Sequence, residues 1–271
     1  MFRKLIAFAV ATIVTAGMAA ESVDARSLDD ILKAGVIRIG VQPNLPPNSV
    51  LKPDGTWEGM DIEMGQEIAK VLKVEAEFVA ANSPQRVPMI VSDQVDIMLG
   101  GLTRNFRRAL LIDYTLPTFT ESQVVLTTDK WASLQSWRDF DREDITLANV
   151  RGSTPAQWTD NNVPKAKKIL FDSGADVIRA IGQGRADGTI AVIDNWLRFT
   201  KDYSGVTWHV LPDTIYLGYW GIGIQRGNDA LRRWLNVWLF DYQSKNKHNA
   251  IWEKWYGSAP AFPVVPSPYF N

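Results

Sequence analysis

The chain has 271 residues, which is long enough for two domains of ordinary size, each with its own core. Hydrophobic residues make up 46% of it and charged residues 22%, and these fractions exclude a disordered or fibrous chain. The formal net charge of −1 implies no large basic surface, so nucleic acid is not an expected partner. The chain has no cysteine, which excludes disulfides, thiol nucleophiles, cysteine metal sites and lipid attachment at a cysteine.

The N-terminus has the three-part pattern of a secretory signal peptide. Arg3 and Lys4 give a positive start, residues 5–20 form an apolar run, and small residues allow cleavage after Ala20 or Ala25. We therefore predict a signal peptide at residues 1–25 and a location in the periplasm. A membrane anchor is the less favoured alternative, because the run is short for a span and cleavage residues follow it.

The next part of the chain alternates between strand and helix patterns. Apolar residues recur at every second position in the strands and along one face in the helices. Strand, helix, strand, helix, strand is typical of a parallel α/β unit. The predicted elements are a helix capped by Ser27 and ended by Gly35, a strand at 36–41, a helix at 60–72, a strand at 74–78, a helix capped by Ser83 and running to about Ser92, and a strand at 95–99.

The same alternation restarts after residues 123–144, which we interpret as the separation between two α/β units. The tail at 229–256 has apolar residues at helical spacing, and its simplest interpretation is packing onto a core. The predicted elements of the second unit are strands at 145–150, 168–171 and 189–193, and helices at 154–158 and 176–181.

Ligands of open α/β sheets lie beyond the carboxyl ends of the strands. This rule indicates four loops, at residues 42–48, 100–108, 151–154 and 194–196. Each of them holds polar, glycine or aromatic residues directly after an apolar strand. Their convergence is the first functional signal in the sequence.

One of these loops has the composition of a carboxylate clamp. The glycines at 100 and 101 let the backbone approach a ligand, and Thr103 adds a hydroxyl and an amide. Residues 105–109 are expected to begin a helix, whose N-terminal amides favour an anion, and Arg108 adds a planar fork that matches a carboxylate. The alternative is a solvated surface arginine beside a turn, and spacing alone leaves both open.

The turn of Gly152, Ser153 and Thr154 is a similar case in the second unit. It is a ready anion site at a helix start, but such a turn is also a common helix cap. On spacing alone the cap is the simpler interpretation.

A series of short motifs extends from about Ser27 to Gly257. In their order they resemble the bacterial family 3 solute-binding proteins, the polar amino-acid receptors of ABC importers. The motifs are ILKAGVIRIGV (31–41), GMDIE (59–63) with residues 68–69, VDI (95–97), GLT (101–103) with Arg108, GST (152–154), GRAD (184–187) and KWYG (254–257).

The resemblance implies an α/β fold of two lobes with two crossovers, the type II periplasmic-binding-protein fold, each lobe a mixed, mostly parallel sheet flanked by helices. Lobe 1 would comprise 27–124 plus 219–271, and lobe 2 would comprise 125–218. The implied function is the binding component of an ABC importer, a monomer that closes around a small carboxylate-bearing ligand, an amino acid, and meets a permease. No cofactor, metal site or catalytic residue is expected.

The resemblance also implies roles at the site. Arg108 and Thr103 would hold the carboxylate, Gly101 would offer backbone contacts, Thr154 would reach the carboxylate from lobe 2, and Asp194 would hold the ammonium. The full set of predicted ligand-binding residues is Gly101, Thr103, Arg108, Ser153, Thr154, Asp194, Asn44 and Trp196.

Some positions depart from the family's pattern, in which the ammonium partner follows the GRAD motif by five residues. Here that position is Val192, and Asp194 is two residues further. In the early loop Gln42 stands at an acid position and Leu45 at an aromatic one. A carboxylate is therefore better supported than an amine. Replacement aromatic walls are available from Trp57, Trp158, Trp196 or Trp220.

Two other functions stay open. The first is a cyclohexadienyl-dehydratase-like enzyme on the same fold, because fold does not fix function. Against it, Asp194 is followed by Asn195, Trp196 and Leu197, with no glutamate. The second is a ligand-binding sensor or accessory protein for a periplasmic partner other than a permease.

Overall fold

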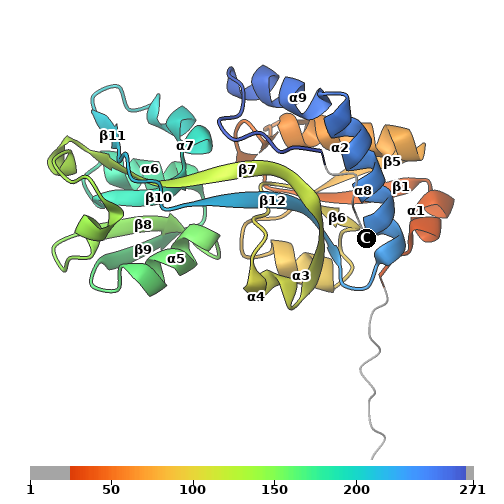
Figure 1. The fold of residues 1–271 in the computed structure, drawn as a ribbon, viewed down its shortest axis with the longest axis horizontal. Helices are drawn as coiled ribbons and strands as arrows, with labels where there is room; N and C mark the ends of the chain where they lie inside the picture. Colours follow the sequence, from red (N-terminus) through yellow and green to blue (C-terminus); the bar gives the residue numbers. More distant parts are fainter. Residues whose placement is uncertain (1–24, 267–271) are drawn as a thin grey trace, which may run out of the picture.

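The computed structural model describes residues 25–266, and the side chains at positions 193–195 and 197 lie outside the description. Two groups of helices and strands are joined by two long strands, β7 (Ile112–Thr128) and β12 (Tyr216–Gln225) (Figure 1). We call the group on the right of Figure 1 lobe 1 and the group on the left lobe 2. The predicted signal peptide, apart from Ala25, lies outside the described residues.

Lobe 1 is built by the N-terminal part of the chain and by its last two helices (Figure 1). Ser27 caps the first helix by accepting a hydrogen bond from the backbone N of Asp30, and Gly35 ends it with φ 67°, as predicted. The elements of lobe 1 are α1 (Leu28–Ala34), β1 (Val36–Val41), α2 (Met60–Leu72), β5 (Glu75–Ala80), α3 (Arg86–Val91), β6 (Ile97–Met98), α4 (Phe106–Ala109), α8 (Asp229–Ser244), α9 (Lys247–Tyr256) and a small sheet of β2 (Asn44–Leu45), β3 (Ser49–Leu51) and β4 (Trp57–Glu58).

The prediction that Ser83 caps a helix is wrong. α3 begins at Arg86, and its N-cap is Gln85. The Ser83 hydroxyl is occupied elsewhere, because it accepts a hydrogen bond of 2.7 Å from Nη2 of Arg86. Ser83 therefore fixes a buried guanidinium instead of a helix end.

Lobe 2 repeats the strand–helix alternation. Ser153 and Ser173 cap its first two α-helices, each by accepting a hydrogen bond from a backbone N in the first turn. The elements are the short 3₁₀ helices η1 (Asp129–Trp131) and η2 (Trp137–Phe140), followed by β8 (Thr146–Val150), α5 (Thr154–Asn162), β9 (Lys167–Phe171), α6 (Gly174–Gly182), β10 (Gly188–Val192), α7 (Ile193–Thr200) and β11 (Trp208–Val210).

One sheet runs through both lobes. Its strand pairs are parallel toward the two ends and antiparallel where β12 and β7 meet their neighbours. The interpretation of residues 123–144 as a plain separator is wrong in its first part, because residues 123–128 continue β7. The predicted lobe boundaries fall inside β7 and β12 and stay a prediction at the residue level. The strand order is β5-β1-β6-β12-β7-β10-β8-β9, and β11 pairs with β7.

Burial follows the predicted patterns. Ile37, Ile39 and Val41 alternate into the core of lobe 1 with no exposed surface. In α8, Leu231 and Leu235 are also fully buried, so the tail packs onto lobe 1 as predicted. The fold class, a mixed and mostly parallel α/β architecture, is confirmed. Within residues 25–266, no helix has both the length and the apolar character needed to cross a membrane.

Candidate functional site

A cavity of about 80 Å³ lies where loops of both lobes meet over the middle of β7 and β12, and we call it the cleft cavity. The sequence predicted that loops after four strands converge, and residues from all four segments line the cavity. The prediction of a loop at 194–196 is wrong, because this segment lies in helix α7, which begins directly after β10. Which of the lining residues bind a ligand stays a prediction. The lining residues from these segments are Gln42 and Leu45 after β1, Gly101 and Thr103 after β6, Ser153 and Thr154 at the start of α5, and Trp196 in α7.

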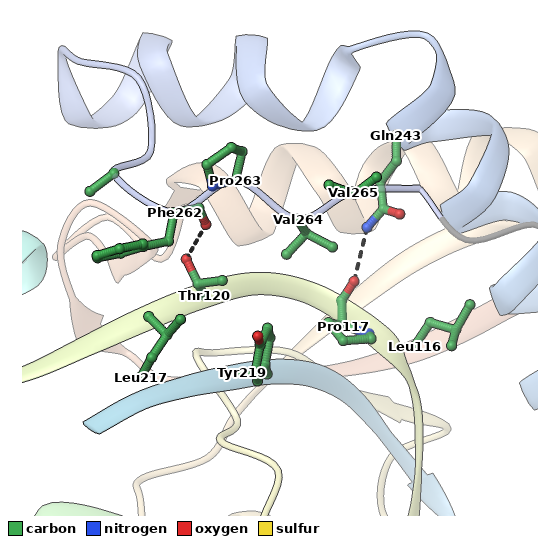
Figure 2. Close-up of a pocket in the computed structure, with 11 residues that line it drawn as sticks. Leu116, Pro117, Thr120, Leu217, Tyr219, Gln243, Phe262, Pro263, Val264 and Val265 are labelled. Atoms are coloured by element: carbon green, nitrogen blue, oxygen red, sulfur yellow. Dashed lines mark hydrogen bonds between the residues drawn. The ribbon is translucent and has the colours of Figure 1, made fainter.

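A larger cavity, of about 630 Å³, lies on the other side of the connecting strands. Figure 2 shows residues 262–265 running over β7 and β12, with Thr120 donating a hydrogen bond to the carbonyl of Phe262. The described residues that line this cavity carry no charge. Because a charged small ligand needs polar partners, we take the smaller cleft cavity as the candidate site.

Arg108 connects the two lobes. Asn105 caps α4 by accepting a hydrogen bond from the backbone N of Arg108 at 2.9 Å. The guanidinium then donates to the carbonyl oxygens of Thr103, at 2.9 Å, and of Gly152 in lobe 2, at 3.3 Å. Arg108 is only 6% exposed, so the alternative of a solvated surface arginine is wrong. It lies behind Thr103 and is not itself part of the cavity lining.

The charge of Arg108 is not neutralised by direct contact. Among the described residues no carboxylate forms an ion pair with it, although Glu121 interacts with it electrostatically. Burial lowers the pKa of Arg108 below its ordinary value, but an arginine stays protonated at neutral pH. A buried cation that lacks an anionic partner favours the entry of an anion.

A second buried arginine, Arg86, supports the same loop. It donates to the carbonyl oxygens of Gly100 at 2.9 Å and Gly101 at 3.3 Å, and it is 4% exposed. Burial, together with the charge of Arg108, lowers the pKa of Arg86 to about 9. Sequence reasoning missed Arg86, because nothing in the linear pattern places it under a loop 14 residues away.

Gly101 and Thr103 line the lobe 1 side of the cavity, and their role in binding stays a prediction. Gly101 has φ 59° and lies against the ring of Trp220, where an added Cβ would be 3.4 Å from the nearest ring atom. Thr103 is 7% exposed and forms an isolated bridge with Trp220. Both residues are therefore held by β12 as well as by their own loop.

On the lobe 2 side, Ser153 and Thr154 have different contacts. The Ser153 hydroxyl accepts a hydrogen bond from the backbone N of Ala156 at 3.2 Å, so the helix-cap interpretation is confirmed for Ser153. The Thr154 hydroxyl accepts a hydrogen bond of 3.3 Å from Nδ2 of Asn105 across the cleft. Lobe 2 therefore contacts the clamp loop at two points, through the Thr154 hydroxyl and through the Gly152 carbonyl that accepts from Arg108.

Of the remaining predicted residues, some line the cleft cavity and others lie elsewhere. Trp196 and Trp220 line the cleft cavity. Trp57 and Trp158 do not, because Trp57 packs on Phe78 and Trp158 on Trp137. Asn44 lines a separate cavity of about 40 Å³ with Trp196.

The side chain of Asp194 lies outside the described residues, and its role as ammonium partner stays a prediction. Val192, which takes the family's usual position for that partner, lines the cleft cavity. Within the described residues, no three or more histidines, aspartates or glutamates are grouped to hold a metal ion.

Two polar residues of β7 also line the cavity and were missed by the sequence analysis. Glu121 is 2% exposed and Gln123 is fully buried. Their spacing of two residues places both side chains on one face of the strand. The available signal was an acid and an amide two residues apart, just before the apolar run at 124–126, but it needed the strand to be recognised first.

Comparison with known proteins finds similarity to bacterial solute-binding proteins. The family model of the bacterial extracellular solute-binding proteins, family 3, matches residues 37–258. The glutamine-binding protein of an ABC transporter from Bacillus subtilis is 26% identical over 76% of this chain and 76% of its own length. A cyclohexadienyl dehydratase from Pseudomonas aeruginosa is 24% identical over 69% of both chains.

Solved structures share the fold. An ancestral amino acid-binding protein, described as a precursor of cyclohexadienyl dehydratase, superposes with a TM-score of 0.78 and 28% sequence identity. The match covers 84% of this chain and 99% of that one. The predicted two-lobe type II fold is thereby confirmed.

Proposed function

Because the chain belongs to the bacterial extracellular solute-binding proteins, family 3, we propose that it binds a small carboxylate-bearing ligand, an amino acid, between its lobes and delivers it to an ABC-importer permease. The observation that carries the proposal is Arg108, a buried guanidinium between the lobes without an ion-paired acid among the described residues. A ligand carboxylate would supply the missing negative charge.

The mechanism follows from contacts that cross the cleft. Arg108 donates to the Gly152 carbonyl and Asn105 donates to Thr154, so the lobe 1 clamp already touches lobe 2 at two points. A ligand that contacts both lobes favours the closed arrangement by its differential affinity for that state. The permease then recognises the closed shape.

Export and a periplasmic location belong to the same proposal. The apolar run after Arg3 and Lys4, followed by small residues, supports a signal peptide that is removed from the mature protein. The N-terminal sequence of the exported protein tests this. A mature N-terminus at residue 21 or 26 is expected, and an intact residue 1 would contradict it.

A thermal-shift screen tests the binding function. The purified chain, unfolded and refolded to remove any carried-over ligand, is heated with single amino acids, amines and dicarboxylates. A ligand at 100 times its Kd stabilises the folded state by about 2.7 kcal/mol, which is readable as a rise in Tm. Calorimetry then gives the affinity of each hit. If no carboxylate raises the Tm while other solutes do, the proposal is wrong.

A second candidate is a dehydratase, which the likeness to a cyclohexadienyl dehydratase and the buried acid Glu121 in the cleft favour. Burial raises the pKa of Glu121, and a protonated carboxyl can donate a proton to a leaving hydroxyl. Incubation with prephenate and with arogenate, followed by product analysis, separates the two functions. Turnover would establish the enzyme, and we expect none.

A further inference from the structure

Glu121 occupies a site that the two connecting strands shape around it. It lies in the middle of β7, opposite Gly218 of β12. A Cβ added at Gly218 would lie 2.6 Å from Oε1 of Glu121, so the absence of a side chain at 218 makes room for the carboxyl group. The strand pair therefore directs one buried carboxyl group to the cleft cavity, which Glu121 lines.

The hydrogen bonds of this carboxyl group are incomplete. Nε1 of Trp220 donates to Oε2 at 2.5 Å, whereas Oε1 has no hydrogen-bond partner among the described residues. Two positions along β7, the amide nitrogen and oxygen of Gln123 are likewise without partners. Thr103 and Gln123 lie close enough to the carboxyl group to favour its charged form, but none of these three atoms has a hydrogen bond of good geometry. Because buried polar groups are almost always well paired in native proteins, the two residues have room for a further partner in the cavity that they line.

The charges around the cavity specify that partner. Of the described residues that line it, Glu121 is the one acid, while Gln42 and Val192 are neutral. No described lysine, arginine or histidine forms an ion pair with Glu121. Burial raises the pKa of Glu121 and outweighs Trp220, Thr103, Gln123 and Arg108, which favour its charged form. A cation that enters the cavity would relieve this cost.

We propose that Glu121 binds the ammonium group of the ligand, with the Gln123 amide beside it, and that the ligand is a small zwitterion. Glu121 lines the cavity and Arg108 adjoins its lining at Thr103, so the two would supply opposite charges for the two ends of the ligand. This rests on the proposed function, and it assigns the ammonium to a connecting strand that belongs to both lobes instead of to Asp194.

The test compares matched ligands on the Glu121→Gln variant of the full mature chain. The probes are L-glutamine, L-alanine and L-arginine, each paired with the acid that lacks the α-amino group: glutaramate, propanoate and 5-guanidinopentanoate. In calorimetry, the wild type should prefer the amine-bearing member of at least one pair. Glu121→Gln should weaken that member about 10- to 100-fold, and its des-amino partner less than about twofold.

Two further variants separate the position of the carboxyl group from its charge. Gly218→Ala keeps the charge of Glu121 but displaces its carboxyl group, and it should also weaken the amine selectively. It serves as the test if Glu121→Gln does not fold. Glu75→Gln, an exposed acid of β5, controls for net charge and should change neither affinity.

The outcomes distinguish this inference from the proposed function. If the wild type binds carboxylates with no preference for the amine, the proposed function holds and the inference is wrong. If Glu121→Gln weakens both members of a pair equally, or if Asp194→Asn alone removes the preference, Glu121 is not the ammonium partner. If the wild type binds neither these probes nor any carboxylate of the thermal-shift screen, the proposed function and the inference are both wrong.

Discussion

At Arg108, burial and charge act against each other. The guanidinium is nearly inaccessible, yet it keeps its charge and is held by two carbonyl oxygens from different lobes. Carbonyl dipoles offset only part of the desolvation cost of a buried cation. An anion that binds next to Arg108 would therefore be stabilised.

We expect Arg108→Ala to weaken carboxylate binding by about 3–5 kcal/mol, a hundredfold or more, because a desolvated ion pair loses one partner. Arg108→Lys keeps the charge but loses the planar fork, so its loss should be smaller but still measurable by calorimetry. The exposed neighbour Arg107→Ala is the matched control. Unchanged affinity in a folded Arg108→Ala protein would remove Arg108 from the site.

Asp187, the acid of the GRAD motif, has a structural role. It accepts hydrogen bonds from Nζ of Lys130 at 2.6 Å, Nε1 of Trp131 at 2.8 Å and the backbone N of Thr146 at 2.8 Å. Burial raises the pKa of Asp187, but the three donors together lower it below its ordinary value. The motif therefore ties β10 to β8 and to the start of lobe 2.

A lowered pKa means that Asp187 stabilises the fold above its unfolded-state pKa of about 3.9 and loses this effect as the pH falls through the folded-state value. Asp187→Asn should lower the free energy of unfolding by about 1–3 kcal/mol at pH 7. The difference from wild type should shrink below about pH 4 in urea denaturation. Asp160→Asn, at a mostly exposed acid, should show little difference at either pH. A pH-independent difference for Asp187→Asn would contradict this account.

At the scale of elements, the start of α2 depends on one close approach. Gly59 has φ 133°, and a Cβ there would lie 2.3 Å from the carbonyl oxygen of Asn48. That same oxygen accepts a hydrogen bond from the backbone N of Asp61 at 2.8 Å. The loop before β3 and the N-terminus of α2 can therefore form this hydrogen bond only if residue 59 has no side chain.

Gly59→Ala should lower the free energy of unfolding by more than about 2 kcal/mol, because it adds a clash with backbone to an unfavourable φ. Gly55→Ala is the control, since Gly55 also has a positive φ, 84°, but has no atom within 4 Å of the added Cβ. It should cost about 1–2 kcal/mol from the backbone conformation alone. Urea midpoints measure both, and equal losses would show that the contact with Asn48 is unimportant.

At the scale of the whole molecule, two long strands connect the lobes, and contacts across the cleft hold them together. Besides the two hydrogen bonds, Gly152 lies against Pro84, and a Cβ at Gly152 would be 3.0 Å from Cα of Pro84. The closed arrangement therefore requires a residue without a side chain at position 152. Because β7 and β12 are continuous through both lobes, motion between the lobes must bend or twist these strands.

We expect Gly152→Ala to disfavour closure, since the new methyl group must push Pro84 away. Small-angle scattering should show a larger radius of gyration with saturating ligand than for wild type, and calorimetry should show weaker binding. Gly184→Ala has the same φ of 70° with open space around the added Cβ, so it controls for backbone strain. If both variants close and bind alike, the contact with Pro84 does not govern closure.

Periodicity and capping within a few residues were enough to predict most of the helices and strands and three of the four loops that converge, whereas the segment at 194–196 is helical. The sequence did not reveal β7 as a continuous strand, whose alternation is interrupted by Pro117 and by the buried pair Glu121 and Gln123. Nor did it identify Arg86 or Glu121 as neighbours of the clamp.

The contacts of Glu121 and Arg108 arise only in the tertiary structure. Glu121 meets Trp220 across 99 positions and Arg108 meets Gly152 across 44, and both contacts exist only once β7 and β12 pair and the lobes face each other. The local sequence pattern predicts which face of a helix or strand a residue occupies, or which loop it belongs to. The distance between two charges, and the water excluded from between them, come from packing of segments that the linear order keeps apart.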